Sequence, residues 1–97
     1  MKKRYNEILR LKGMLEKAGI PFRFSKSFGG YHIEYPNSAY KVCSVIEHDG
    51  SYGRRQDLLA IMGLLTKKEK KEDVVLGYLT AENVFQRIEK HWRKLKR

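Results

Sequence analysis

The spacing of the hydrophobic residues constrains the fold of this chain more than any other feature. In both terminal segments these residues recur at intervals of three and four, which places them on one face of a helix. The intervals predict a helix over residues 4–18 and a strongly amphipathic helix over residues 81–96. The first apolar stripe comprises Ile8, Leu11, Leu15 and Ala18, and the second comprises Val84, Phe85, Ile88, Trp92 and Leu95.

The ends of these predicted helices carry recognisable signals. Gly19, followed closely by Pro21, is a natural stop for the first helix. Thr80 is a good N-cap for the last helix, and Leu79 and Val84 are spaced as a hydrophobic staple.

Between the helices, apolar residues alternate with polar ones, as expected of half-buried strands. Alternation over residues 22–25 and 31–35 predicts two strands, and residues 40–47 predict a third, more continuously apolar and therefore well covered. Residues 58–65 would be apolar on nearly all sides of a helix and therefore predict a short buried helix. The pattern of residues 73–79 is ambiguous between a strand and irregular structure. The sequence thus predicts one α+β domain over residues 1–97. Its three- or four-stranded antiparallel meander is packed by an N-terminal helix, a short central apolar helix and a C-terminal basic helix.

Composition narrows the functional classes. No apolar run approaches the roughly 18 residues that a membrane span requires, and no signal-peptide segment follows the basic start. The single cysteine, Cys43, cannot form an internal disulfide and lies in an apolar run typical of a buried small hydrophobe. We therefore expect a cytoplasmic protein that does not act at a membrane.

Positive charge is concentrated near the two ends of the chain. The formal net charge is +10. Residues 1–18 carry six Lys or Arg against two Glu, a net +4, and residues 84–97 carry six against one, a net +5. The remaining 65 residues contribute only +1. This segregation favours an anionic partner such as nucleic acid, an anionic membrane or an acidic protein.

Within the predicted helices, cations form two rows that lie away from the apolar stripes. A nucleic-acid backbone is the commonest partner for such rows, because Lys and Arg displace its condensed counterions. An ordinary solvated surface is the alternative interpretation. The first row comprises Lys3, Arg10 and Lys17 at intervals of seven, and the second comprises Arg87, Lys90, Lys94 and Arg97 at intervals of three and four.

A Gly-rich loop over residues 49–55 is a second candidate anion site. Glycine allows the backbone to approach a phosphate closely, and Ser51, Arg54 and Arg55 supply hydrogen-bond donors. The loop matches neither GxxxxGK[ST] nor GxGxxG, and turn geometry also explains its glycines. A small-nucleotide binder that uses this loop is therefore one alternative function.

Catalysis by a metal-dependent nuclease is a further alternative. Residues 47–49, Glu-His-Asp, begin at the last residue of a predicted strand whose neighbour carries His32 and Glu34. Consecutive strand residues point to opposite faces, so the first two of the three would not converge without a bend. No zinc-binding pattern such as HExxH is present. We therefore expect a non-enzymatic protein with no catalytic residue, metal or cofactor.

The predicted order of a helix, three strands, a Gly-rich loop and a helix resembles a double-stranded RNA-binding domain over about two thirds of the chain. Residues 29–32, Gly-Gly-Tyr-His, are similar to the turn after that family's first strand. Arg54 and Arg55 fall near the place where its basic second helix begins. The family's KKxAK pattern is absent, and the residues after Asp57 are apolar.

A second resemblance is carried by residues 44–53, 57–66 and 76–85. These segments resemble small uncharacterised proteins from phages and prophages of Gram-positive bacteria. The resemblance implies a phage or mobile-element accessory protein, often one that binds nucleic acid or blocks a host defence complex. We expect this protein to bind DNA or RNA through its basic helix faces. The alternative partner is a nucleic-acid-processing bacterial defence complex that the protein inhibits.

Overall fold

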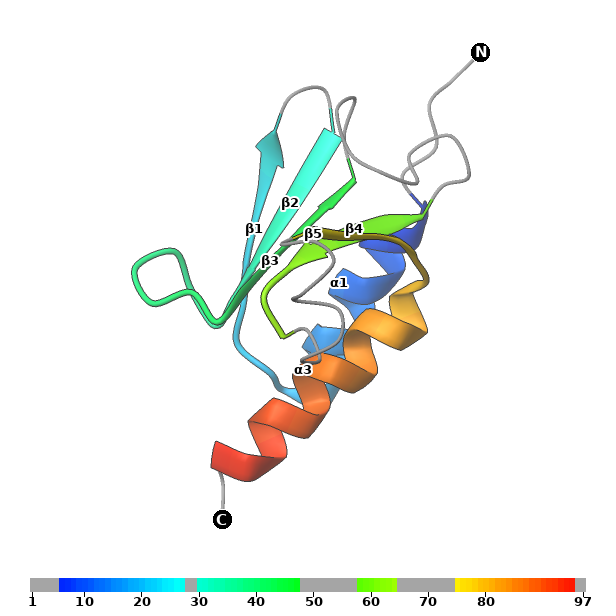
Figure 1. Cartoon of the computed structure of the whole chain (residues 1–97). Helices are drawn as coiled ribbons and strands as arrows, with labels where there is room; N and C mark the ends of the chain where they lie inside the picture. The colour runs from blue at the N-terminus through cyan, green and yellow to red at the C-terminus, as the bar shows by residue number, and fades with distance from the viewer. Residues whose placement is uncertain (1–5, 28–29, 48–57, 65–74, 96–97) are drawn as a thin grey trace.

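The computed structural model describes residues 6–27, 30–47, 58–64 and 75–95. In these residues a five-stranded antiparallel sheet is packed on one face by α1 and α3 (Figure 1). The predicted α+β class and antiparallel meander are confirmed, with five strands where three or four were predicted. The elements are α1 (Asn6–Ala18), β1 (Arg23–Ser27), β2 (Gly30–Tyr35), β3 (Cys43–Glu47), β4 (Leu59–Met62), β5 (Val75–Leu79) and α3 (Ala81–Leu95).

The strands follow one another across the sheet in sequence order, and each is antiparallel to its neighbours. One cross-strand row shows the register, because Ile33 stands opposite Phe24 on β1 and opposite Val45 on β3. Val45 in turn stands opposite Ile61 on β4. The row packs in the core beneath α1 and α3.

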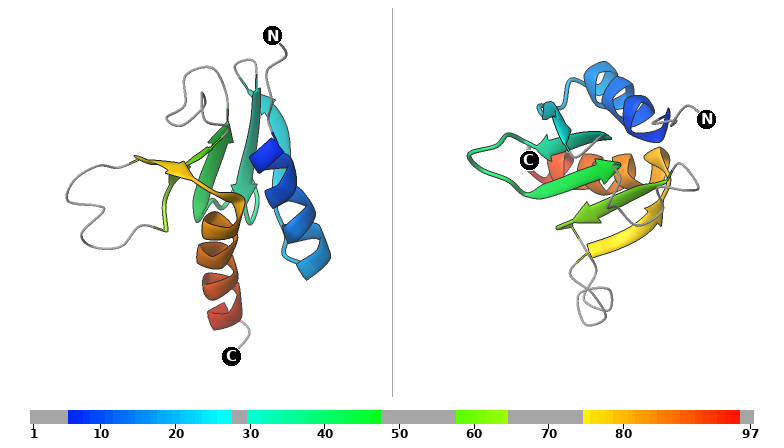
Figure 2. Two further views of the ribbon diagram at one scale, coloured as in Figure 1. Left: turned by 90° about the vertical axis from the view of Figure 1, so that its right-hand side faces the viewer. Right: turned by 90° about the horizontal axis from the view of Figure 1, so that it is seen from above.

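α1 and α3 lie side by side and run in the same direction across the sheet (Figure 2). α1 contacts β2 and β3, whereas α3 contacts β4. Each fully buried Leu, Ile or Val side chain contributes about 1.5–3 kcal/mol of hydrophobic stabilisation. The core side chains from the two helices are Ile8, Leu11, Leu15, Ala81, Val84 and Ile88, with Met14, Phe85 and Trp92 partly buried against them.

The predicted helix ends are confirmed in detail. Gly19 adopts a φ of +71°, and its N–H donates to the carbonyl of Glu16. The N–H of Ile20 donates to the carbonyl of Leu15 at 3.0 Å, which completes a Schellman motif. At the start of α3, the hydroxyl of Thr80 accepts a hydrogen bond from the N–H of Asn83 at 3.2 Å.

The central helix predicted over residues 58–65 is wrong, because Leu59–Met62 form strand β4. Leu59, Ala60 and Ile61 are all fully buried, so both faces of this short strand are covered. A strand buried on both faces is continuously apolar, and over four residues its pattern cannot be told from that of a buried helix. β4 therefore stands where the resemblance to a double-stranded RNA-binding domain implies a second helix.

The backbone turns sharply where β4 ends. Gly63 has a φ of +100°, and a Cβ built there would lie 2.4 Å from the carbonyl oxygen of Val42. Leu64 follows with a φ of +54°. The ambiguous residues 73–79 include strand β5.

Candidate functional site

One side of α3 lines an open pocket of about 510 Å³, here called the α3 groove. The lining residues recur at intervals that bring successive turns of α3 to the same side of the helix. Among the described residues that line the groove, three are Lys or Arg and none is an acid. The lining side chains are Leu64, Asn83, Gln86, Arg87, Lys90, His91 and Lys94.

The acidic residues of α3 lie on a different side of the helix. At 3.6 residues per turn, Glu82 is roughly 140° around the axis from Arg87. Glu82 forms an ion pair with Arg10 of α1, and Glu89 pairs with Arg93 at 3.5 Å. The ion pairs of Glu82 and Glu89 therefore lie on another side of α3 than Lys90 and Lys94 of the groove.

Arg87 connects α3 to the end of β4 at one side of the groove. Its Nε donates to Oδ1 of Asn83 at 2.9 Å, and one terminal nitrogen donates to the carbonyl oxygen of Leu64 at 3.0 Å. Leu64 itself has a left-handed backbone conformation, with a φ of +54°. Arg87 thus shapes the groove as well as contributing charge.

His91 connects the groove to the core. Its Nδ1 lies 2.8 Å from the hydroxyl oxygen of Tyr35 on β2, and the two rings meet edge to face at 89°. Tyr35 is fully buried. Burial raises the pKa of the Tyr35 phenol above its ordinary value, and the nearby Cys43 side chain raises it further. The hydroxyl therefore keeps its proton at neutral pH.

The first predicted cation row does not continue the groove. Arg10 pairs with Glu7 and with Glu82, so it lies against the first turn of α3 on the side away from the groove. Lys17 is exposed on α1, and Lys3 lies outside the described residues. In the part of the chain that the structure describes, the two predicted rows do not form one surface through Arg10.

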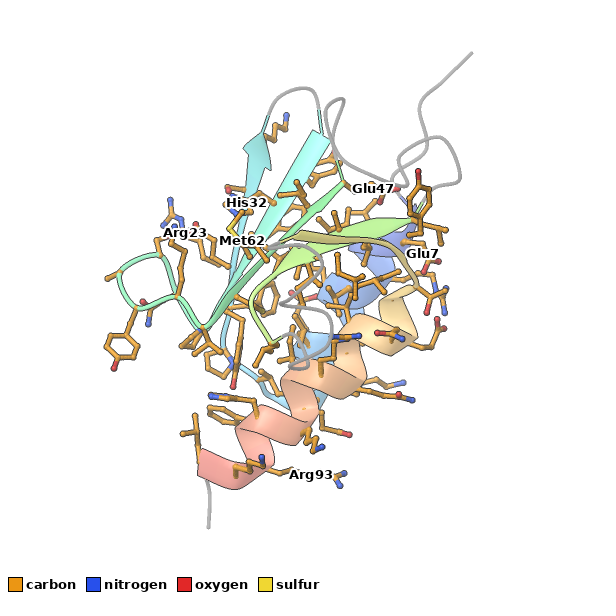
Figure 3. All side chains as sticks on the ribbon, viewed as in Figure 1. Glu7, Arg23, His32, Glu47, Met62 and Arg93 are labelled. Carbon is orange, nitrogen blue, oxygen red and sulfur yellow. The ribbon has the colours of Figure 1, made fainter. Side chains whose placement is uncertain are left out.

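The N-termini of α1 and α3 are natural anion sites, but carboxylates of the protein occupy them. Oε1 of Glu47 accepts a hydrogen bond from the N–H of Ile8 at 3.1 Å, and Oε2 of Glu7 accepts one from the N–H of Ala81 at 2.6 Å. Figure 3 shows Glu7 and Glu47 near the beginnings of these helices. An external anion is therefore better accommodated by the α3 groove.

Among the described residues considered for a metal site, Glu47 lies on one face of the sheet, and His32 and Glu34 lie on the other, whereas His48 and Asp49 lie outside the described residues. Glu47 is buried beneath α1, whereas His32 lies on the face away from the helices (Figure 3). Glu34 pairs with the exposed Lys41 and accepts a hydrogen bond from Ser38. Within the described ranges, no three His, Cys, Asp or Glu side chains are grouped to hold a metal ion.

Cys43 is 2% exposed, as the sequence predicts for a buried small hydrophobe. Burial raises the pKa of its thiol to about 12, so the thiol is neutral at physiological pH. A buried thiol with a raised pKa does not suit a nucleophilic role, because a reactive cysteine requires an accessible thiolate.

Several predicted site residues lie outside the residues that the structure describes. These are Lys3, Ser51, Arg54, Arg55 and Arg97, so the phosphate-binding hypothesis for residues 49–55 gains no structural support. Conversely, Asn83, Gln86 and His91 were not predicted from the sequence as binding residues. Their intervals of three and four from Arg87, Lys90 and Lys94 were a signal that could have identified them. No sequence pattern points to Leu64, which reaches the groove only through the folding of β4.

Within the described residues, neither α1 nor α3 is long and apolar enough to cross a membrane. In comparisons with known proteins, no family model, curated protein or solved structure matches this chain.

Proposed function

We propose that this protein is a non-enzymatic nucleic-acid-binding protein that uses the α3 groove. The observation that carries the proposal is the segregation of charge around α3. Arg87, Lys90 and Lys94 line a concave surface with no described acid, while Glu82 and Glu89 are paired elsewhere.

The side chains of the groove suit a phosphate backbone. Lys90 and Lys94 are exposed and lie one turn apart, about 6 Å along the helix axis, so each can reach a different phosphate. Lysine binds phosphate as a mobile point charge, and each lysine that neutralises a phosphate releases condensed counterions. Asn83 and Gln86 add amide groups that can contact sugars or base edges.

The setting of this activity follows from the sequence resemblance. We infer that the protein is a phage or mobile-element accessory protein whose nucleic-acid partner is met in the cytoplasm of a bacterial host. A groove that binds a backbone without reading its sequence is sufficient for such a role. DNA and RNA are both retained as partners, because the described cations recognise the phosphate that they share.

The test is a titration of labelled single-stranded DNA, single-stranded RNA and duplex DNA at several salt concentrations. The logarithm of the binding constant is expected to fall linearly with the logarithm of the salt concentration. A variant with Lys90→Ala and Lys94→Ala should bind more weakly and reduce the magnitude of this slope by about 2, close to 1 for each lost phosphate contact.

The matched control carries Lys26→Ala and Arg93→Ala, which remove the same charge from β1 and from the other side of α3. It should leave the slope within about 0.5 of the wild-type value. Equal effects of the two double variants would show that only net charge matters and would remove the groove as the site. Absence of salt-dependent binding to all three probes would overturn the proposed function. Co-purification with a host protein would then favour the defence-inhibitor alternative.

A further inference from the structure

The contact between Tyr35 and His91 joins a buried hydroxyl to the wall of the α3 groove. Tyr35 has no exposed surface, and its hydroxyl oxygen lies 2.8 Å from Nδ1 of His91. The ring centroids are 5.5 Å apart at 89°, so the edge of the imidazole faces the phenol. The position of this hydrogen bond determines which edge of His91 faces the groove.

The direction of the hydrogen bond follows from the burial of the phenol hydroxyl, whose proton needs an acceptor. Burial, and then the neighbouring Cys43, raise the pKa of Tyr35, so the hydroxyl carries its proton at neutral pH. In the described residues this hydroxyl has its hydrogen bond with His91, and a buried O–H left without an acceptor would be costly. The hydroxyl therefore donates to Nδ1, which must be unprotonated to accept.

A neutral imidazole whose Nδ1 is an acceptor carries its proton on Nε2. Nε2 is separated from Nδ1 by one ring carbon, so its N–H points away from the Tyr35 hydroxyl, and His91 lines the α3 groove beside Arg87, Lys90 and Lys94. The imidazole thus offers an N–H donor on the groove side without needing a positive charge of its own. A neutral N–H among cations is a suitable donor to a phosphate oxygen.

We propose that neutral His91 binds a phosphate oxygen of the nucleic-acid backbone through Nε2–H, and that Tyr35 is the positioning residue that fixes this tautomer. The inference rests on the proposed function, since it assigns a specific phosphate contact within the same groove. It also separates the roles of the groove residues. Lys90 and Lys94 supply positive charge, whereas His91 supplies one hydrogen bond whose direction is fixed by its contact with the buried Tyr35.

Two substitutions distinguish the ring nitrogens. In His91→Gln the amide nitrogen of the glutamine can take the place of Nε2. In His91→Asn the shorter asparagine side chain places its amide nitrogen only where Nδ1 was. Affinity for a labelled oligo(dT) strand should be nearly unchanged in His91→Gln and about tenfold weaker in His91→Asn, the loss expected for a hydrogen bond to a charged group. Equal affinities of wild type and His91→Asn would overturn the inference while leaving the proposed function standing.

The tautomer is read directly from long-range ¹H–¹⁵N correlations of the histidine rings, with His91 assigned from its absence in His91→Gln. Wild-type protein should show the Nε2–H form, and Tyr35→Phe should show a mixture of the two tautomers. A charged His91 ring, or an Nδ1–H form, in the wild type at neutral pH would contradict the proposal. Thermal unfolding of Tyr35→Phe shows whether the variant is folded, and the His91 variants carry the test if it is not.

Titration with inorganic phosphate separates this inference from the proposed function. A change in the His91 Nε2 resonance in wild type, reduced in a variant with Lys90→Ala and Lys94→Ala, supports the phosphate contact even if no oligonucleotide binds. Binding of oligonucleotide with no change at His91 overturns the inference alone. If neither inorganic phosphate nor an oligonucleotide binds, both proposals are overturned.

Discussion

Glu7 on α1 accepts a hydrogen bond from the N–H of Ala81, the first residue of α3, at 2.6 Å. Its carboxylate also pairs with Arg10, which in turn pairs with Glu82 in the first turn of α3. Residues 74 positions apart in the chain are thereby joined at the point where α1 and α3 begin side by side. The relative position of the helices, and with it the placement of the α3 groove, depends on this contact.

Removal of the Glu7 carboxylate should destabilise the fold. Glu7→Ala leaves the Ala81 N–H without its acceptor and takes a negative charge from two adjacent helix N-termini. The expected loss is about 1–2 kcal/mol of unfolding free energy, measured by urea denaturation. The control is Glu16→Ala on the exposed side of α1, where the pair with Lys12 is worth less than about 0.5 kcal/mol. Equal losses in the two variants would show that the contact with Ala81 contributes nothing specific.

Gly63 should be intolerant of any side chain. A Cβ there would lie 2.4 Å from the Val42 carbonyl oxygen and 3.0 Å from Cys43, and the φ of +100° is unfavourable for an L residue. Gly63→Ala is expected to cost about 2–4 kcal/mol, and it should also displace Leu64 from the groove. The control is Gly13→Ala in α1, where no atom lies within 4 Å of the added Cβ. This control should stabilise the protein by about 0.5–1 kcal/mol, so a loss there, or none at Gly63, would contradict the prediction.

The long elements of this fold were predictable from the sequence because their periodicity extends over several turns. α1 and α3 have 13 and 15 described residues, and Thr80 and Gly19 mark their ends by local chemistry alone. β4 was mistaken for a helix because four residues, all apolar, are too few to distinguish the two periods.

The candidate site was predictable only in part. The row Arg87, Lys90 and Lys94 belongs to one helix, so its common face follows from local geometry. The pairing of Arg10 with Glu82 joins residues 72 positions apart, and the hydrogen bond between Tyr35 and His91 joins residues 56 apart. Such contacts depend on how α1, α3 and the sheet pack, which no local pattern reports.

Cys43 should resist alkylation in the folded protein. Its thiol is 2% exposed, and burial raises its pKa to about 12, so little thiolate is present and little of it is accessible. Labelling with iodoacetamide at mildly alkaline pH, followed by mass spectrometry, should be at least about a thousandfold slower than in urea-unfolded protein. Because the chain has one cysteine, Cys43→Ala supplies a control that takes up no label. Rapid, complete labelling without denaturant would show that the thiol is exposed.

Glu34 should make stability depend on pH in the acidic range. The hydroxyl of Ser38 donates to its carboxylate at 2.8 Å, and Lys41 lies 3.3 Å from the other oxygen. The Ser38 hydrogen bond is the largest cause that lowers the pKa of Glu34 below its ordinary value of 4.5; Lys41 and His32 also lower it, against an opposing effect of burial.

A carboxyl with a lowered folded-state pKa stabilises the fold above its unfolded pKa. This contribution is lost as pH falls below 4.5 and through the folded value. Glu34→Gln should therefore be less stable than wild type in urea at neutral pH, and the difference should shrink as pH falls below 4.5. Ser38→Ala should reproduce part of the loss at neutral pH, whereas Glu16→Gln should change little at either pH. A difference between Glu34→Gln and wild type that stays constant with pH would show that the ionised form of Glu34 is not what stabilises the loop between β2 and β3.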